Sequence, residues 1–258
     1  MAKRTTRKAP NGAQVIRRVL AAAVPRPRSE SSKEDKNKYA IRFADKMGQE
    51  IASALARHLP GTECSPKRKS QSLRNAKQLD VNFSSPEMGL ALGLSLKSVH
   101  IREGTGSRRY THNKKRNEEE LRIEASGYHK RQPYAVMIGV LFLPIDSCDD
   151  AKKNNSSSFG SWVRHLRPYS GRSGPHDDAD RFEKLYIALY EPDGSDLRFF
   201  DVESAPPKAG RPSNSLEFNE FIDACHETYN SRNSLDFTWD DGSEPEPNDE
   251  SDESESGQ

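Results

Sequence analysis

The clearest pattern in the chain is an apolar residue at every fourth position between residues 36 and 59. It places one stripe on a helix, formed by Tyr39, Phe43, Met47, Ile51 and Leu55. The dipeptide Pro60-Gly61 ends this pattern. Two apolar segments follow, LDVNF and LALGLSLKSVHI, separated by the turn-like sequence SSPEMG. We therefore predict a helix followed by a hairpin of two buried strands.

The rest of the chain continues to alternate between helical and strand-like patterns. Residues 117–131 are typical of a helix, with Asn117 as the expected N-cap and acids in the first turn. The segment YAVMIGVLFLP after it is apolar enough for a central strand. We further expect a short helix near residues 159–166, a β-hairpin of FEKLYIALYE and DLRFFDV, and a closing helix over residues 216–229. Together these elements predict an α/β protein with a mixed central sheet flanked by helices, and with a β-hairpin and a helix at its C-terminal end.

Composition divides the chain into three parts. Residues 1–35 are rich in Lys and Arg, whereas residues 240–258 are acidic and hold no aromatic or aliphatic residue. Neither end can bury enough apolar surface to offset the entropy lost on ordering. We expect a basic disordered arm over 1–35, a folded domain over 36–239 and an acidic disordered tail over 240–258. The net charge of +1 includes the acidic tail, and without this tail the rest of the chain is basic. A basic chain favours a polyanionic partner.

The cysteines and the apolar runs exclude several classes of protein. Cys64, Cys148 and Cys225 are widely spaced and odd in number, so we expect neither a disulfide framework nor a structural zinc site. This pattern favours a cytoplasmic protein. The longest apolar run is only strand-sized, and we expect no membrane association.

Asp80 and Lys97 carry a resemblance to a known family. Asp80 opens the first strand of the predicted hairpin, and the tripeptide Ser95-Leu96-Lys97 lies on the second. With a helix before the hairpin and a helix and an apolar strand after it, residues 36–144 resemble the core of the PD-(D/E)xK nuclease superfamily, the restriction-endonuclease-like fold. Two positions depart from the family motif, because Leu79 replaces its proline and Ser95 replaces its second acid.

The resemblance implies a metal-dependent DNA endonuclease of the restriction or phage-defence type, working as a homodimer or with partner proteins in a defence complex. Relatives with Ser-x-Lys take the missing acid from the following helix, which here holds Glu118, Glu119, Glu120 and Glu124. Glu120 and Glu124 share one helix face, and both are candidate catalytic residues. We expect Glu120, which is nearer the helix start, to hold Mg²⁺ together with Asp80. Glu87 and Glu50 are alternatives, and Mn²⁺ is an alternative ion.

The residue types suit this chemistry independently of the family. Mg²⁺ binds one or two carboxylates together with water and phosphate oxygens. Lys97 could stabilise the charge of the transition state, or orient and deprotonate the attacking water. Ser95 shares a strand face with Lys97 and could hydrogen-bond a water on the metal. The structural alternative is that Asp80 satisfies a turn and that Lys97 belongs to a buried ion pair.

A basic stretch before the second helix interleaves aromatic residues with cations. Its candidate nucleic-acid-binding residues are Arg108, Arg109, Tyr110, His112, Lys114, Lys115 and Arg116. Such a composition is typical of phosphate contacts and base stacking, although a solvated loop is an equally good interpretation. Gln132, at the end of the second helix, is a further candidate. We expect DNA as the partner, with RNA as an alternative, and a non-catalytic nucleic-acid-binding or scaffold protein remains the second interpretation.

Overall fold

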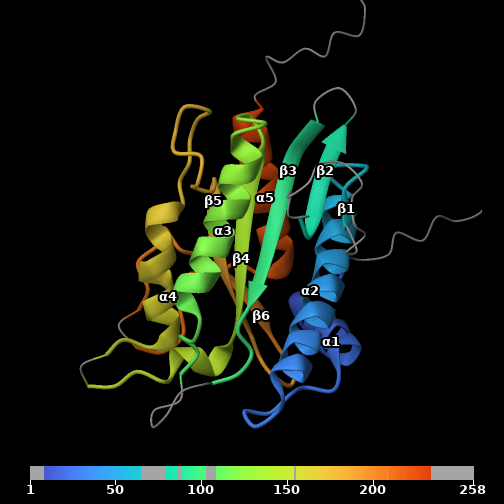
Figure 1. The fold of residues 1–258 in the computed structure, drawn as a ribbon. Coiled ribbons are helices and arrows are strands. Elements are labelled where there is room, and N and C mark those ends of the chain that lie inside the picture. Colours follow the sequence, from blue (N-terminus) through green and yellow to red (C-terminus); the bar gives the residue numbers. More distant parts are fainter. Residues whose placement is uncertain are drawn as a thin grey trace, which may run out of the picture.

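The computed structural model describes most of the chain between residues 9 and 233 (Figure 1). The ranges are 9–64, 79–85, 89–102, 109–153, 155–207 and 209–233. Its elements are α1 (Gly12–Ala23), α2 (Lys33–Leu55), β1 (Glu63–Cys64), β2 (Val81–Ser85), β3 (Gly89–Ser98), α3 (Lys114–His129), β4 (Val136–Pro144), η1 (Ile145–Cys148), α4 (Ser158–Leu166), η2 (Arg167–Tyr169), β5 (Lys184–Tyr190), β6 (Leu197–Asp201) and α5 (Phe218–Arg232).

The strands form one mixed sheet in the order β1-β2-β3-β4-β5-β6. The pairs β1–β2, β2–β3 and β5–β6 are antiparallel, whereas β3–β4 and β4–β5 are parallel. All nine residues of β4 are buried, as expected for a strand at the centre of a covered sheet. The predicted α/β class with a mixed central sheet is therefore confirmed, and so are both predicted hairpins.

Helices cover the sheet on both faces. One core lies between the sheet and α1, α2 and α5, and it includes Phe43, Leu94 and Phe221. The second core lies between the opposite face and α3 and α4, and it includes Leu121 and Trp162. Alternate residues of β4 and β5 contribute to the two cores, which is why these strands are apolar on both sides. No helix in the described ranges is long and apolar enough to cross a membrane.

The expectation that residues 1–35 form a disordered arm is wrong for α1. Asn11 and Gln14 form a capping box at its start, and an apolar stripe of Val15, Ile16 and Val19 is fully buried against the first core. The helix is stable here because this stripe packs on α2, while its arginines point away from the core. Residues 1–8 and the acidic tail over 240–258 lie outside the described residues.

The second predicted helix begins earlier than expected. Helix α3 starts at Lys114, and its N-cap is Asn113 in a left-handed conformation with φ 57°. Asparagine tolerates this backbone better than most residues. Asn117 therefore lies in the first turn, and Lys114, Lys115 and Arg116 belong to the helix and not to a loop.

A buried ionic cluster ties the amino ends of β4 and β5 to α3 and α5. Glu183 accepts hydrogen bonds from the Met137 amide at 2.8 Å and from Arg172 Nη1 at 2.8 Å. Its carboxylate also lies 3.3 Å from His129 Nε2 and 3.6 Å from Arg232 Nε. Burial alone would raise the pKa of Glu183, but these hydrogen bonds and the His129 charge outweigh burial and hold the pKa below its usual value.

Candidate active site

Asp80 lies immediately before β2 and is fixed against β3. Its backbone amide donates to the Leu94 carbonyl at 3.2 Å, which extends the antiparallel pairing by one residue. Its carboxylate Oδ2 accepts the Leu96 amide at 2.7 Å. Asp80 Oδ1 accepts no hydrogen bond from any residue that the structure describes. The acid thus has one oxygen anchored to the strand that carries Ser95 and Lys97, and one oxygen without a protein donor.

Ser95 and Lys97 both reach the same glutamate on α3. Lys97 Nζ donates to Glu124 Oε1 at 2.9 Å, and Ser95 Oγ donates to Glu124 Oε2. The Lys97 side chain is 13% exposed and that of Glu124 is 4% exposed, so the ion pair is nearly enclosed. The spacing of two residues along β3 puts the hydroxyl and the amine on one face, and α3 packs over that face. Four side chains named from the sequence, Asp80, Ser95, Lys97 and Glu124, therefore meet at the β2–β3 edge.

The carboxyl group of Asp80 has a pKa well above its usual value. The pKa of the Asp80 carboxyl is raised to about 6, mainly by burial and in smaller part by the negative charges of Glu124 and Asp45. The hydrogen bond from the Leu96 amide and the charge of Lys97 act in the opposite direction. Three acids thus share one nearby ammonium group, and a cation bound at Asp80 would relieve the repulsion between them.

Glu124, and not Glu120, joins the cluster. Leu121 and Ala125 pack into the second core, and Glu124 lies three residues after the first and beside the second, so it shares their sheet-facing side. Glu120 is rotated away from this face, and its side chain is 33% exposed with Arg116 Nε at 2.9 Å. The structure therefore does not support the preference for Glu120 as the partner of Asp80.

The other acidic candidates lie close to basic residues outside the cluster, or they lie outside the described ranges. Glu118 is buried beside Arg122, 2.9 Å away, and Glu119 is exposed on α3 near Lys115. Glu50 pairs with Arg18. Glu87 lies outside the described residues.

The basic stretch contributes less to a nucleic-acid surface than its composition suggests. Arg109 donates to the Ser156 carbonyl at 2.5 Å, and Lys114 Nζ donates to Ser161 Oγ at 3.0 Å. Tyr110 is buried, and its hydroxyl donates to Asp146 at 2.9 Å, so its ring is not available to stack on a base.

Three of the remaining candidates lie on the surface, one belongs to the scaffold, and one lies outside the described residues. His112, Lys115 and Arg116 are exposed at the start of α3. Gln132 Oε1 accepts the Leu90 amide at 3.0 Å, at the opposite end of β3 from Lys97, so this glutamine belongs to the scaffold. Arg108 lies outside the described residues.

Asp45 is a neighbour of the cluster that the sequence pattern did not reveal. It lies three residues before Gly48 on α2, and a Cβ atom at Gly48 would come within 3.3 Å of the Asp80 carbonyl oxygen. The Asp45 carbonyl also faces Cys64 Sγ at 3.8 Å. A glycine inside an otherwise apolar helical stripe was the available signal, because it marks close approach of another chain segment.

Metal ligation at this corner would rest on two carboxylates. Within the described ranges, no three His, Cys, Asp or Glu side chains come close enough together to hold a metal ion. Asp80 and Glu124 nevertheless provide hard oxygen donors, and the remaining positions of a Mg²⁺ ion are commonly filled by water and substrate phosphate. The donor set fits Mg²⁺ or Mn²⁺ better than the softer metals, which prefer sulfur and imidazole.

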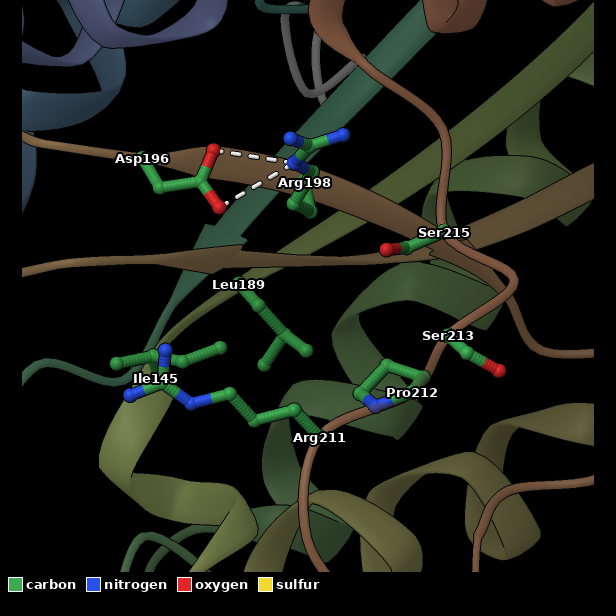
Figure 2. A pocket seen from close by; sticks show the side chains of 8 residues that line it. All are labelled: Ile145, Leu189, Asp196, Arg198, Arg211, Pro212, Ser213 and Ser215. Atoms are coloured by element: carbon green, nitrogen blue, oxygen red, sulfur yellow. Dashed lines mark hydrogen bonds and ion pairs between the residues drawn. The ribbon is translucent and has the colours of Figure 1, made fainter.

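A separate pocket of about 210 Å³ lies at the carboxyl ends of β4 and β5 (Figure 2). Ile145, Leu189 and Pro212 provide its apolar lining. Its two arginines already have acidic partners, because Arg198 pairs with Asp196 and Glu217 and Arg211 Nη1 lies 2.8 Å from Glu191. The pocket therefore presents little uncompensated charge, and none of its lining residues belongs to the Asp80 cluster.

The chain was compared with protein families, with curated proteins and with solved structures. No family model, curated protein or solved structure matches it. What the comparisons leave is an α/β protein with a six-stranded mixed sheet, and its function must be inferred from the geometry around Asp80.

Proposed function

We propose that the protein is a metal-dependent endonuclease that hydrolyses phosphodiester bonds in DNA, of the restriction or phage-defence type. The observation that carries the proposal is the convergence of Asp80, Ser95, Lys97 and Glu124 beside the neighbouring strands β2 and β3. Two acids and an amine held close together are the groups that metal-assisted phosphodiester hydrolysis requires. A buried lysine that faces two acids is otherwise a costly arrangement for a protein to keep.

The order of the elements adds support. Apart from the two-residue strand β1, the chain runs through helix α2, the antiparallel strands β2 and β3, the crossover helix α3, and β4 parallel to β3. This is the order of the nuclease core that the sequence resembles. Asp80, immediately before β2, and Lys97, near the end of β3, are the residues to which the resemblance gives the roles of first acid and lysine.

Each side chain has a distinct task in this proposal. A Mg²⁺ ion held by Asp80 and Glu124 would neutralise charge on the phosphate and make a bound water more acidic. The Leu96 amide fixes the direction of the Asp80 carboxylate, and Ser95 Oγ fixes that of Glu124. Lys97 Nζ then donates a hydrogen bond to the attacking water or to a phosphate oxygen, which stabilises the charge that develops there.

A second function is favoured by one observation. Both oxygens of Glu124 accept hydrogen bonds from within the protein, as they would in a purely structural buried ion pair. A non-catalytic protein that binds nucleic acid, or that acts as a scaffold in a defence complex, would keep this pair without needing a metal.

A cleavage assay separates the two functions. Supercoiled plasmid and linear duplex are incubated with the protein and Mg²⁺ or Mn²⁺, with and without EDTA. We expect cleavage that EDTA abolishes and that Lys97→Ala removes, while the exposed control Lys130→Ala cleaves like wild type. DNA binding without cleavage in either metal would favour the non-catalytic protein and overturn the nuclease proposal.

A further inference from the structure

The segment between α1 and α2 lies at the same end of the molecule as the carboxyl end of β3 (Figure 1). Arg26 Nη2 donates to the His100 carbonyl at 3.4 Å. Arg42, on α2, donates from Nε to the Ala23 carbonyl at 3.1 Å, at the end of α1. Because α1 is packed on the core, this connector over residues 24–32 is held in place and does not trail away from the domain.

Two cations on the connector form no ion pair within the described part of the chain. Arg26 and Arg28 are exposed, and neither forms an ion pair with any residue that the structure describes. Other arginines in this part of the molecule differ in this respect, because Arg18 pairs with Glu50 and Arg102 pairs with Asp146. An exposed guanidinium group that is not held in an ion pair is available to a ligand.

These cations lie a short distance from the candidate active site. The carbonyl that Arg26 contacts belongs to His100, three residues beyond Lys97 on the continuation of β3. Three residues of extended chain span about 10 Å. One strand of duplex DNA rises by about 3.4 Å for each phosphate, so this span corresponds to roughly three nucleotides.

We propose that the Arg26–Arg28 connector is a phosphate-binding surface for duplex DNA, which holds the backbone roughly three nucleotides from the bond placed at Lys97. The position of the bond relative to Lys97 rests on the proposed nuclease function. The surface itself rests on the two unpaired arginines. Guanidinium groups bind phosphate oxygens through paired N–H donors, and contacts to the backbone position the duplex without reading its sequence.

The test measures duplex binding in EDTA, where a metal-dependent nuclease cannot cut its ligand. Fluorescence anisotropy with a labelled 20-base-pair duplex gives the binding constant at several salt concentrations. The slope of log K against log salt concentration is negative, and each lost phosphate contact reduces its magnitude by about 0.9. We expect the double variant Arg26→Gln/Arg28→Gln to make the slope less negative by about two, equally for duplexes of different sequence. The charge-preserving variant Arg26→Lys/Arg28→Lys should keep the wild-type slope.

The matched control is Lys130→Gln/Arg131→Gln, which removes two exposed charges just after α3, far along the chain from the connector. This variant should leave the slope unchanged. Equal melting temperatures show that the variants fold. The proposal is overturned by an unchanged slope in the arginine double variant, by an absence of duplex binding to the wild type, or by an effect confined to single-stranded RNA. Cleavage in Mg²⁺ with an unchanged slope would refute only this surface, and a lowered slope without any cleavage would refute only the nuclease.

Discussion

At the scale of single residues, the choice between two glutamates on α3 decides whether the candidate site is complete. Glu124→Gln removes a carboxylate charge from the cluster and leaves Lys97 without its ion-pair partner. We expect a loss of cleavage of about 10³-fold, which corresponds to about 4 kcal/mol of transition-state stabilisation. The rate of plasmid cleavage at saturating Mg²⁺ measures this loss, and the melting temperature reports any change in folding.

Glu120→Gln is the matched control on the same helix. Its side chain is partly exposed and pairs with Arg116 on the surface, so we expect cleavage and stability close to wild type. If Glu120→Gln abolished cleavage and Glu124→Gln did not, the assignment of the second acid to Glu124 would be wrong.

His100 makes folding stability sensitive to mild acid. Burial, with the charge of Arg26, lowers the pKa of His100 to about 3 from its usual 6.5, and its Nδ1 faces the Tyr190 hydroxyl at 2.9 Å. The unfolded chain takes up a proton below about pH 6.5 and the folded chain does not, so stability is complete above that pH and falls below it. Between pH 7 and pH 5, His100 should cost the wild type about 2 kcal/mol.

Urea unfolding of the wild type and of His100→Gln at both pH values checks this expectation. The stability of the wild type relative to the variant should fall by about 2 kcal/mol on going from pH 7 to pH 5. A difference that does not change with pH would show that His100 titrates alike in the folded and unfolded chains.

The sequence named Asp80, Ser95 and Lys97, and it named Glu124 as a candidate, but it favoured Glu120 as the second acid. A strand alternates with a period of two, so residues 95 and 97 had to share a face wherever the strand lay. The rotation of α3 about its axis could not be obtained from EEELRIE alone, because that depends on which apolar residues dock on the sheet. Leu121 and Ala125 dock there, and they bring Glu124 inward.

At the scale of elements, α1 shows how charge can conceal a buried helix. Its arginines suggested a disordered arm, yet the stripe of Val15, Ile16 and Val19 together with the capping-box sequence Asn-x-x-Gln was already present. The central strand and the two hairpins were predictable because their apolar runs are bounded by turn residues. The short strand β1 was not, because two residues pairing with Asn82 and Val81 leave no pattern of their own.

Helix α1 should contribute directly to the stability of the domain. Ile16 is fully buried, so Ile16→Ala removes apolar contacts and leaves a cavity between α1 and the core. We expect the free energy of unfolding to fall by about 3 kcal/mol, measured by urea denaturation. Ala22→Gln, at an exposed position of the same helix, should change it by less than about 0.5 kcal/mol. Equal stability of Ile16→Ala and wild type would mean that α1 does not dock.

At the scale of the whole molecule, the Glu183 cluster joins segments that are distant in the sequence. Arg172 and Arg232 lie in the loop before β5 and at the end of α5, and both face the same carboxylate. Glu183→Gln would leave these buried cations without their acid. We expect the free energy of unfolding to fall by about 3 to 5 kcal/mol in urea denaturation. Glu227→Gln, exposed on α5, is the control, and an equally small effect of both variants would argue against a role of the cluster in holding the elements together.

The mixed direction of the sheet has a consequence for the order in which the protein becomes able to act. The contact between Asp80 and Leu96 spans 16 residues within one hairpin, whereas the Lys97–Glu124 pair spans 27 residues and needs the crossover through α3. Helix α3 is the crossover between the parallel strands β3 and β4, so we expect its position on the sheet to be fixed once β4 has paired with β3. A nascent chain that ends before β4 contains Glu124, but its α3 is not yet held in place beside Lys97. Under the proposed nuclease function, we expect the chain to gain the ability to cleave nucleic acid only after β4 has emerged from the ribosome.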